Sequence, residues 1–233
     1  MSKRIAVIVG VGPGLGTALT REFVDNGLTV VAAARHAASL EALASFPSQS
    51  VFPRDCDATS SADVSELFAF TAELGSIELA VFNAGAFTRT NVVDTDPEEF
   101  ERCWRVGCLA GLHVGQEAAK RMTEEGRGTI IFTGATASLR GGPGFVNLAS
   151  PKFALRALAQ SMARELAPGG IHVAHVIIDG QIRAPRYEAQ SDERGPDSLL
   201  EPQAIAQQYL VLHQQHRSAW THELDLRPWV ERF

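Results

Sequence analysis

The chain has 233 residues, of which 45% are hydrophobic and 21% charged, with a formal net charge of −6. This length and composition suit one α/β domain with a full core, and they give no sign of a second domain. Lys and Arg do not cluster and the balance is acidic, so we expect no nucleic-acid partner and no membrane partner.

The cysteines and the first residues indicate a cytoplasmic location. The three cysteines, Cys56, Cys103 and Cys108, are odd in number and lack metal-ligand spacing, so each is predicted to be a small buried hydrophobe and no metal site is expected. The chain begins with Met-Ser-Lys-Arg and one short apolar run, which is neither a signal peptide nor a transmembrane segment.

The first thirty residues predict a strand, a glycine turn and a helix. Residues 4–9, which are apolar after Arg4, run into Gly10, Gly12, Gly14 and Gly16, and Leu15 opens an apolar-periodic segment. Such a turn offers backbone N–H groups and the positive end of a helix dipole, and glycines allow a pyrophosphate to approach closely. A dinucleotide is therefore the expected ligand, although a tight loop alone would need the same glycines.

The second predicted strand, residues 28–34, indicates which dinucleotide binds. The residue that closes this strand faces the adenosine ribose in folds of this kind, and a carboxylate there would repel a 2′-phosphate. Here Ala34 is followed by Arg35, so we predict NADP(H) rather than NAD(H). The alternative is that Arg35 is an ordinary solvated surface residue.

The middle of the chain alternates strands and helices. Helices are predicted over 38–45 and 64–74, and strands near 51–53 and over 77–82. Asp57 follows a strand and is placed to accept from an adenine amino group, and Asn83, Ala84 and Gly85 break the next strand. Asp96 and Pro97 begin a long helix, with small residues along one side.

The remaining elements complete a doubly wound parallel sheet with helices on both faces. We predict strands at 128–134 and 171–178 and helices at 153–166 and 202–216, so that ligands lie beyond the carboxyl ends of the strands. Residues 183–198 read as a substrate lid, or else as a plain linker. The tail, residues 218–233, is aromatic and amphipathic, and its Trp220, Leu224, Leu226 and Trp229 are predicted to pack in a core or interface.

Three motifs in this order resemble the short-chain dehydrogenase/reductase family: the glycines at 10, 14 and 16, the Asn83–Gly85 triplet, and a helix bearing Lys152 after a Gly/Pro loop. The resemblance covers about residues 1–182. It implies a single-domain Rossmann fold, a nicotinamide cofactor, a small-molecule substrate, and a homodimer or homotetramer packed through two long helices. The residues expected to bind the cofactor are Gly10, Gly12, Gly14, Leu15, Gly16, Arg35, Asp57, Asn83, Ala84, Gly85, Lys152, Gly180 and Ile182.

The family's catalytic residues do not carry over. Its Tyr, four residues before the Lys, corresponds to Leu148, its Ser to Ala135, and its helical Asn to Gly107. Neither Leu148 nor Ala135 can donate a proton or orient a carbonyl, and general acid catalysis is worth about a hundred- to ten-thousand-fold. Lys152 and Ser138 are the predicted substitutes, with ribose binding and turn formation as their respective alternatives.

Other polar residues are weaker candidates. Asp179 would bring a carboxylate to the nicotinamide edge, or would be a turn residue at the end of a strand. His113 and His175 lie in apolar contexts and are predicted to be satisfied core histidines.

Two functions of different class follow. The first is an NADP(H)-dependent oxidoreductase acting on a small carbonyl or alcohol through a non-standard proton donor. The second is a catalytically inactive NADP(H)-binding protein that acts as a sensor or scaffold. Hydride transfer to an activated alkene or imine, which needs no Tyr-type acid, lies between them.

Overall fold

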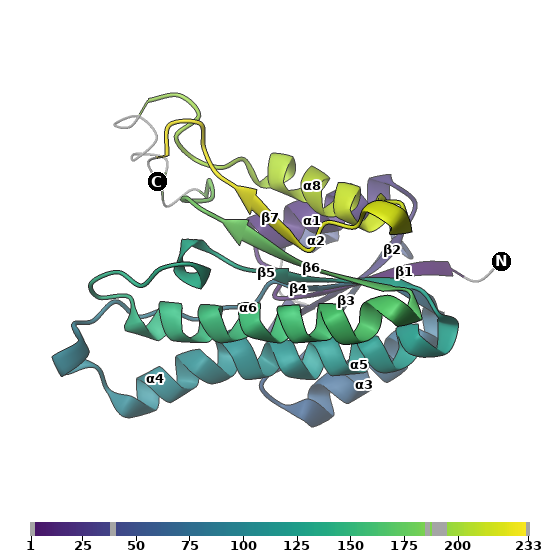
Figure 1. The fold of residues 1–233 in the computed structure, drawn as a ribbon. Coiled ribbons are helices and arrows are strands. Elements are labelled where there is room, and N and C mark those ends of the chain that lie inside the picture. The colour runs from purple at the N-terminus through teal and green to yellow at the C-terminus, as the bar shows by residue number, and fades with distance from the viewer. Residues whose placement is uncertain (1–2, 38–40, 185–186, 188–194, 232–233) are drawn as a thin grey trace.

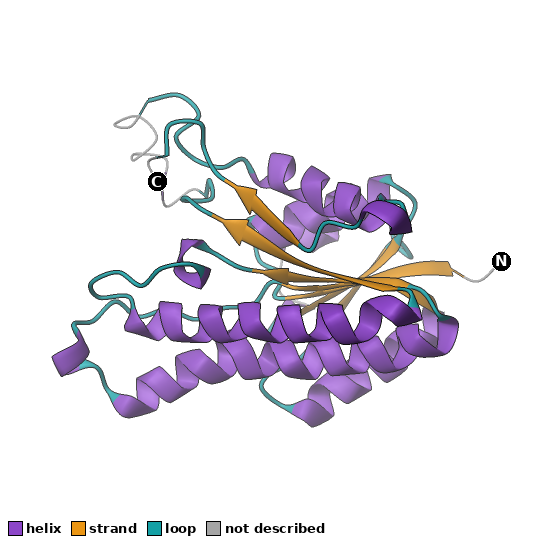
Figure 2. Ribbon diagram, viewed as in Figure 1, coloured by secondary structure: helices purple, strands orange, loops and turns teal. Residues whose placement is uncertain are grey.

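The computed structural model describes residues 3–37, 41–184, 187 and 195–231. These residues form a seven-stranded, wholly parallel sheet in the order β3-β2-β1-β4-β5-β6-β7 (Figures 1 and 2). The predicted doubly wound parallel sheet is confirmed. The strands are β1 (Lys3–Val9), β2 (Thr29–Ala34), β3 (Val51–Asp55), β4 (Gly75–Phe82), β5 (Gly128–Thr133), β6 (Ile171–Ile178) and β7 (Glu223–Leu226).

Helices cover both faces of the sheet (Figure 1). One face carries α1 (Leu15–Asp25), α2 (Glu41–Ala44) and α8 (Pro202–Gln214). The other carries α3 (Ser61–Leu74), α4 (Pro97–Trp104), α5 (Ala110–Glu125) and α6 (Val146–Leu166). Central strands are buried on both sides, because Ile5 and Val7 of β1 pack under α3 and α5 while Ala6 and Ile8 pack under α1 and α8.

Two helices differ from their predicted form. Helix α6 begins at Val146 rather than at 153, and Pro151 lies inside it. A proline is usually confined to the first helical turn because it lacks an N–H, so its sequence position suggested a later start. The predicted long helix is divided by a π-helical segment, Arg105–Leu109, between α4 and α5.

The tail contributes a strand that the sequence did not reveal. Leu224 and Leu226 pack on the core beneath α8, and β7 pairs in parallel with the second half of β6. Trp220 stacks on His172 with ring centroids 5.0 Å apart. These three positions agree with the predicted packing role, whereas Trp229 remains 79% exposed in the single chain.

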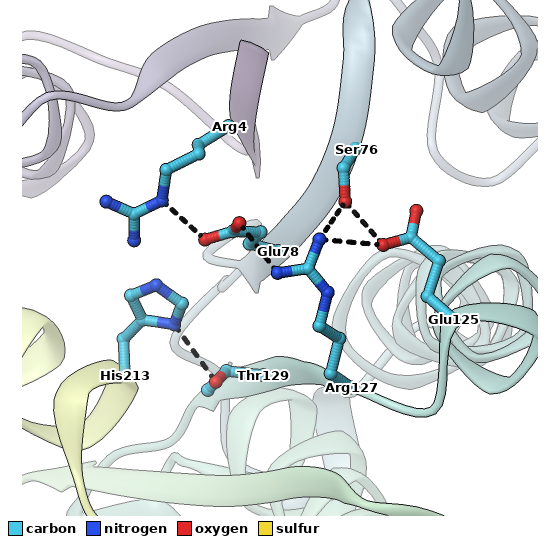
Figure 3. Close-up of polar contacts among 7 residues, drawn as sticks. All are labelled: Arg4, Ser76, Glu78, Glu125, Arg127, Thr129 and His213. Atoms are coloured by element: carbon cyan, nitrogen blue, oxygen red, sulfur yellow. Dashed lines mark hydrogen bonds and ion pairs between the residues drawn. The ribbon is translucent and has the colours of Figure 1, made fainter. Parts of the chain in front are cut away.

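An ionic network ties the amino ends of three strands together (Figure 3). Glu78 of β4 accepts from Arg4 of β1 at 2.8 Å and from Arg127 at 3.2 Å. Arg127 also donates to Ser76 and Glu125. This network lies at the end of the sheet opposite the glycine turn, so it supports the scaffold rather than the candidate site.

The cysteines are buried as predicted, and burial raises the pKa of the Cys56 thiol to about 11. No helix in the described ranges is both long enough and apolar enough to cross a bilayer.

Candidate functional site

The glycine turn after β1 contains two kinds of glycine. Gly10 has a φ of +100°, and a Cβ there would lie 2.4 Å from the backbone nitrogen of Ala84. A Cβ on Gly16 would lie 2.6 Å from the Cα of Val11. These two glycines are required by packing, and the side-chain amide of Asn83 donates to the carbonyl of Gly10 at 2.9 Å. The glycine turn and the Asn83–Gly85 triplet therefore form one unit.

Gly12 and Gly14 have no such packing reason. A Cβ at either position would meet nothing within 4 Å. Helix α1 starts directly after Gly14, which has no side chain to cap the helix, and its first turn holds no acidic residue. The exposed backbone and the uncapped positive helix end form an anion-binding arrangement.

A cavity of about 590 Å³ opens beside this turn at the carboxyl ends of β1, β2 and β4. Seven predicted cofactor residues line it: Gly10, Gly12, Arg35, Asp57, Asn83, Ala84 and Gly85. Sequence reasoning missed several lining residues, of which Arg102, His36 and Thr59 are polar. Arg102 lies four residues before Val106, which also lines the cavity, and residues at that spacing share one side of a helix. That spacing is the sequence feature that could have indicated Arg102.

Asp57 is present in the cavity wall, but its carboxylate is already engaged. Oδ1 accepts from the backbone N–H of Thr59 at 2.9 Å and from its hydroxyl at 2.8 Å. This turn places the carboxylate just before the start of α3, and an adenine amino group would have Oδ2 as its acceptor.

Lys152 lies on α6 and does not line this cavity. Its side chain is 7% exposed, and its Nζ donates to the backbone carbonyl of Thr133 at 2.6 Å. Burial disfavours the ammonium form and lowers the pKa of Lys152 to about 8. The amine is therefore poised to gain or lose a proton near neutral pH.

Ser138 is enclosed at the loop that follows β5. The residue is fully buried, and its Oγ accepts from the backbone N–H of Ala135 at 3.1 Å while its own N–H bonds back to the Ala135 carbonyl at 2.8 Å. This geometry is that of the turn-forming alternative. Ala135 itself is an extended residue without a polar side chain.

Gly107 lies in the π-helical segment and touches α6. A Cβ at this position would lie 2.8 Å from the Cβ of Pro151. Leu148 is on α6 one turn before Lys152 and so shares its side of the helix. The π-helical segment and α6 thus pack closely at Gly107, the position where the short-chain dehydrogenase/reductase pattern has an Asn.

The predicted nicotinamide edge contains a buried polar cluster. Asp179 is 5% exposed, accepts a hydrogen bond from the Thr136 hydroxyl, and forms an ion pair with Arg227 at 3.2 Å. The adjacent Gly180 has a φ of +150°, and a Cβ there would lie 2.8 Å from Pro228. Asp179 therefore ties β6 to the chain after β7.

The proposed lid falls mainly on residues 185–186 and 188–194, which lie outside the described residues. The described residues at and beside the two ends of the proposed lid are paired. Ile182 forms a parallel bridge with Leu200, and the N–H of Arg183 donates to the Leu200 carbonyl at 2.9 Å. Ile182 also packs on the core, and neither it nor Gly180 lines the 590 Å³ cavity.

The prediction of two satisfied core histidines is wrong for His175, because neither of its buried ring nitrogens has a hydrogen-bond partner among the described residues. His113 places Nδ1 3.1 Å from the Ala58 carbonyl. His175 is fully buried, with Nδ1 3.4 Å from Glu223, which Arg156 holds with two hydrogen bonds. Burial lowers the pKa of His175 to about 4, so this imidazole is neutral at physiological pH.

The residues present fit a phosphorylated dinucleotide. The open backbone at Gly12 and Gly14 and the uncapped helix end suit a pyrophosphate. Ala34 and the next residue, Arg35, both line the cavity, so this part of its wall carries a cation and no carboxylate. Among the described residues no group of three His, Cys, Asp or Glu side chains is placed to hold a metal ion.

Comparison with known proteins gives one consistent result. A family model described as short chain dehydrogenase matches residues 4–193. A 3α-hydroxysteroid dehydrogenase of Mediterraneibacter gnavus is 27% identical over 208 residues, which are 87% of this chain and 81% of that protein.

Solved structures agree over nearly the whole chain. A short-chain dehydrogenase from Rhodopseudomonas palustris is 37% identical with a TM-score of 0.83, covering 97% of this chain and 99% of the other. A metagenomic short-chain oxidoreductase solved in complex with NADP is 24% identical with a TM-score of 0.82, covering 99% of each chain. At that identity the second likeness concerns the fold.

Proposed function

Because this chain belongs to the short-chain dehydrogenase family, we propose that it is an NADP(H)-dependent oxidoreductase acting on a small carbonyl or alcohol. The nicotinamide ring, when bound, supplies or accepts the hydride. The chain's own residues must bind the dinucleotide, orient the substrate and move one proton to or from its oxygen.

The preference for NADP(H) is supported by the wall of the cavity at the end of β2. Ala34 offers no carboxylate to the ribose hydroxyls, and Arg35 lines the cavity beside it. A guanidinium binds a 2′-phosphate through charge-assisted hydrogen bonds. Equal affinity for NADPH and NADH would contradict this preference.

The observation that carries the enzymatic proposal is the buried amine of Lys152. Its pKa of about 8 makes both protonation states accessible near neutral pH, which is the condition for an effective general acid or base. We assign it the exchange of a proton with the substrate oxygen. Its hydrogen bond to Thr133 holds the amine beside the carboxyl end of β5, where ligands of parallel sheets bind.

A panel assay tests this assignment. NADPH consumption is followed with aldehydes, ketones, dicarbonyls and enones, and NADP⁺ reduction with the matching alcohols. Lys152→Ala is expected to lose about a hundredfold or more in kcat, in line with general acid catalysis. Lys120→Ala is the matched control, because Lys120 is an exposed lysine on α5. Undiminished turnover by Lys152→Ala would overturn the role given to Lys152.

A second candidate is a catalytically inactive NADP(H)-binding sensor or scaffold. The observation favouring it is that Gly107, Ala135 and Leu148 carry no group able to transfer a proton. The double variant Ala135→Ser/Leu148→Tyr restores two of the family's groups, and it leaves Gly107 unchanged because Pro151 occupies that space. Turnover by the restored variant alone would favour the binding protein over the enzyme.

The remaining proposals concern assembly and location. We propose a cytoplasmic homodimer or homotetramer packed through α5 and α6, and the 43% exposed Phe153 on α6 supports an interface there. Sedimentation of the wild type beside Phe153→Glu tests it. A wild type that sediments as a monomer would contradict the assembly.

A further inference from the structure

We propose that Arg102 is an additional cofactor-binding residue, which holds a phosphate group of the dinucleotide from α4. This inference rests on the proposed function, since it supposes that the cavity beside the glycine turn receives that cofactor. The chemistry recognised is a phosphate, either the 2′-phosphate or the pyrophosphate, and the experiment below distinguishes the two.

The first support is position. Arg102 lines the same 590 Å³ cavity as Arg35 and the glycine turn, although it comes from a helix on the opposite side of the sheet from α1. Arg35 follows β2, so the two guanidiniums reach the cavity from elements far apart in the sequence. Two cations that line one cavity suit a ligand that carries several negative charges.

The second support is that the guanidinium is held in one orientation. Arg102 donates hydrogen bonds from Nε and Nη2 to the two carboxylate oxygens of Glu99, at 2.6 Å and 2.7 Å. Glu99 is itself fixed, because it accepts from the hydroxyl of Thr88 and from the thiol of Cys103 at 3.6 Å. A guanidinium fixed on one side loses less conformational entropy when it binds a ligand.

The third support is the nitrogen that remains. Within the described ranges no hydrogen bond is formed by Nη1 of Arg102, so its two N–H donors are available. The arrangement differs from that of Arg105 one turn later, whose Nη1 lies 3.5 Å from Glu101 and which does not line the cavity. The side chains of Arg102 and Arg105 are similarly exposed, at 51% and 49%, so the cavity lining and the two-point contact with Glu99 are what distinguish Arg102.

The local charge is compatible with an anion at this wall. Among the described residues that line the cavity, Asp57 is the one with a carboxylate, and its Oδ1 already accepts two hydrogen bonds from Thr59. The hydrogen bonds from Arg102 lower the pKa of Glu99 to about 2, so the two-point contact between Glu99 and Arg102 persists at every physiological pH. Phosphate binding thus requires no rearrangement of Glu99.

Cofactor titration tests the inference without any substrate. NADPH and NADH are titrated by their fluorescence against wild type, Arg102→Met, Arg102→Lys and the matched control Arg105→Met. Loss of a charge-assisted hydrogen bond is expected to raise the Kd of NADPH about tenfold or more in Arg102→Met. Arg102→Lys, which keeps the charge, is expected to recover part of that affinity.

The comparison of the two cofactors identifies the phosphate. Weakening confined to NADPH indicates the 2′-phosphate, and equal weakening of both indicates the pyrophosphate. Wild-type affinity in Arg102→Met, or a loss no greater than that of Arg105→Met, would overturn the inference. Failure of the wild type to bind either cofactor would instead overturn the proposed function, and the role of Arg102 with it. Circular dichroism establishes that each variant is folded.

Discussion

Replacing Lys152 with Met is expected to reverse the order of stability between variant and wild type as the pH rises. The folded-state pKa of about 8 lies below the ordinary value of 10.5. Between these values the unfolded chain binds more protons than the folded one, so the stability of the wild type rises with pH across this window. Methionine is of similar length and has no charge to desolvate.

The magnitude follows from the shift. A difference of about 2.5 pKa units corresponds to about 3 kcal/mol of destabilisation at pH 7, and this falls below about 1 kcal/mol at pH 10. Methionine cannot replace the hydrogen bond to Thr133, whose loss costs about 1 to 2 kcal/mol at every pH. Lys152→Met is therefore expected to be more stable than wild type by about 1 to 2 kcal/mol at pH 7, and slightly less stable at pH 10.

Urea unfolding followed by tryptophan fluorescence at pH 7, 8, 9 and 10 measures these differences. Comparison with Lys120→Met, a substitution at an exposed lysine, removes the titration of other groups that the variants share. A difference between Lys152→Met and wild type that stays constant from pH 7 to 10 would refute the argument, because it would mean that Lys152 titrates alike in both states.

Three further outcomes are expected. Gly107→Ala should lose about 1 to 3 kcal/mol in urea unfolding, since its Cβ would lie 2.8 Å from Pro151, and unchanged stability would show that the helices readily separate. Gly12→Ala should unfold as wild type does but bind NADPH more weakly in titration, and unaltered binding would place the pyrophosphate elsewhere. Glu223→Gln should lower the free energy of unfolding by about 1 kcal/mol at pH 7, because it weakens the contact with Arg156. Arg156 keeps the pKa of Glu223 low in the folded state, so the difference from wild type should disappear as acid protonates the wild-type carboxyl. An equal difference at pH 7 and pH 3 would contradict this expectation.

The elements that the sequence could predict are those with a local physical cause. The apolar runs at β1, β4 and β6 are buried on both faces of the sheet, so their composition alone marks them as central parallel strands. The glycine turn and the Asn83–Gly85 triplet are short-range features of the backbone. Seven of the residues predicted to bind the cofactor lie in or near these features, and they line one cavity.

Features that depend on distant partners were not predictable. Strand β7 has four residues, of mixed polarity, and it becomes a strand because β6 offers an unpaired edge there. Pro151 is tolerated inside α6 where it packs against Gly107 of another helix. The alternation Glu-Leu-Asp-Leu at 223–226 is only four residues long, and nothing in the sequence near Pro151 marks its contact with Gly107.

The site divides in the same way. The sequence alone determined the family, the parallel sheet and the glycine turn, because each depends on residues close together in the chain. Tertiary structure decided the environment of individual groups: it enclosed Ser138 in its own turn, lowered the pKa of Lys152 by burial, and brought Arg102 to the cavity of Arg35. Proton affinity and ligand access depend on desolvation and on neighbours from other elements, and these exist only once the chain has folded.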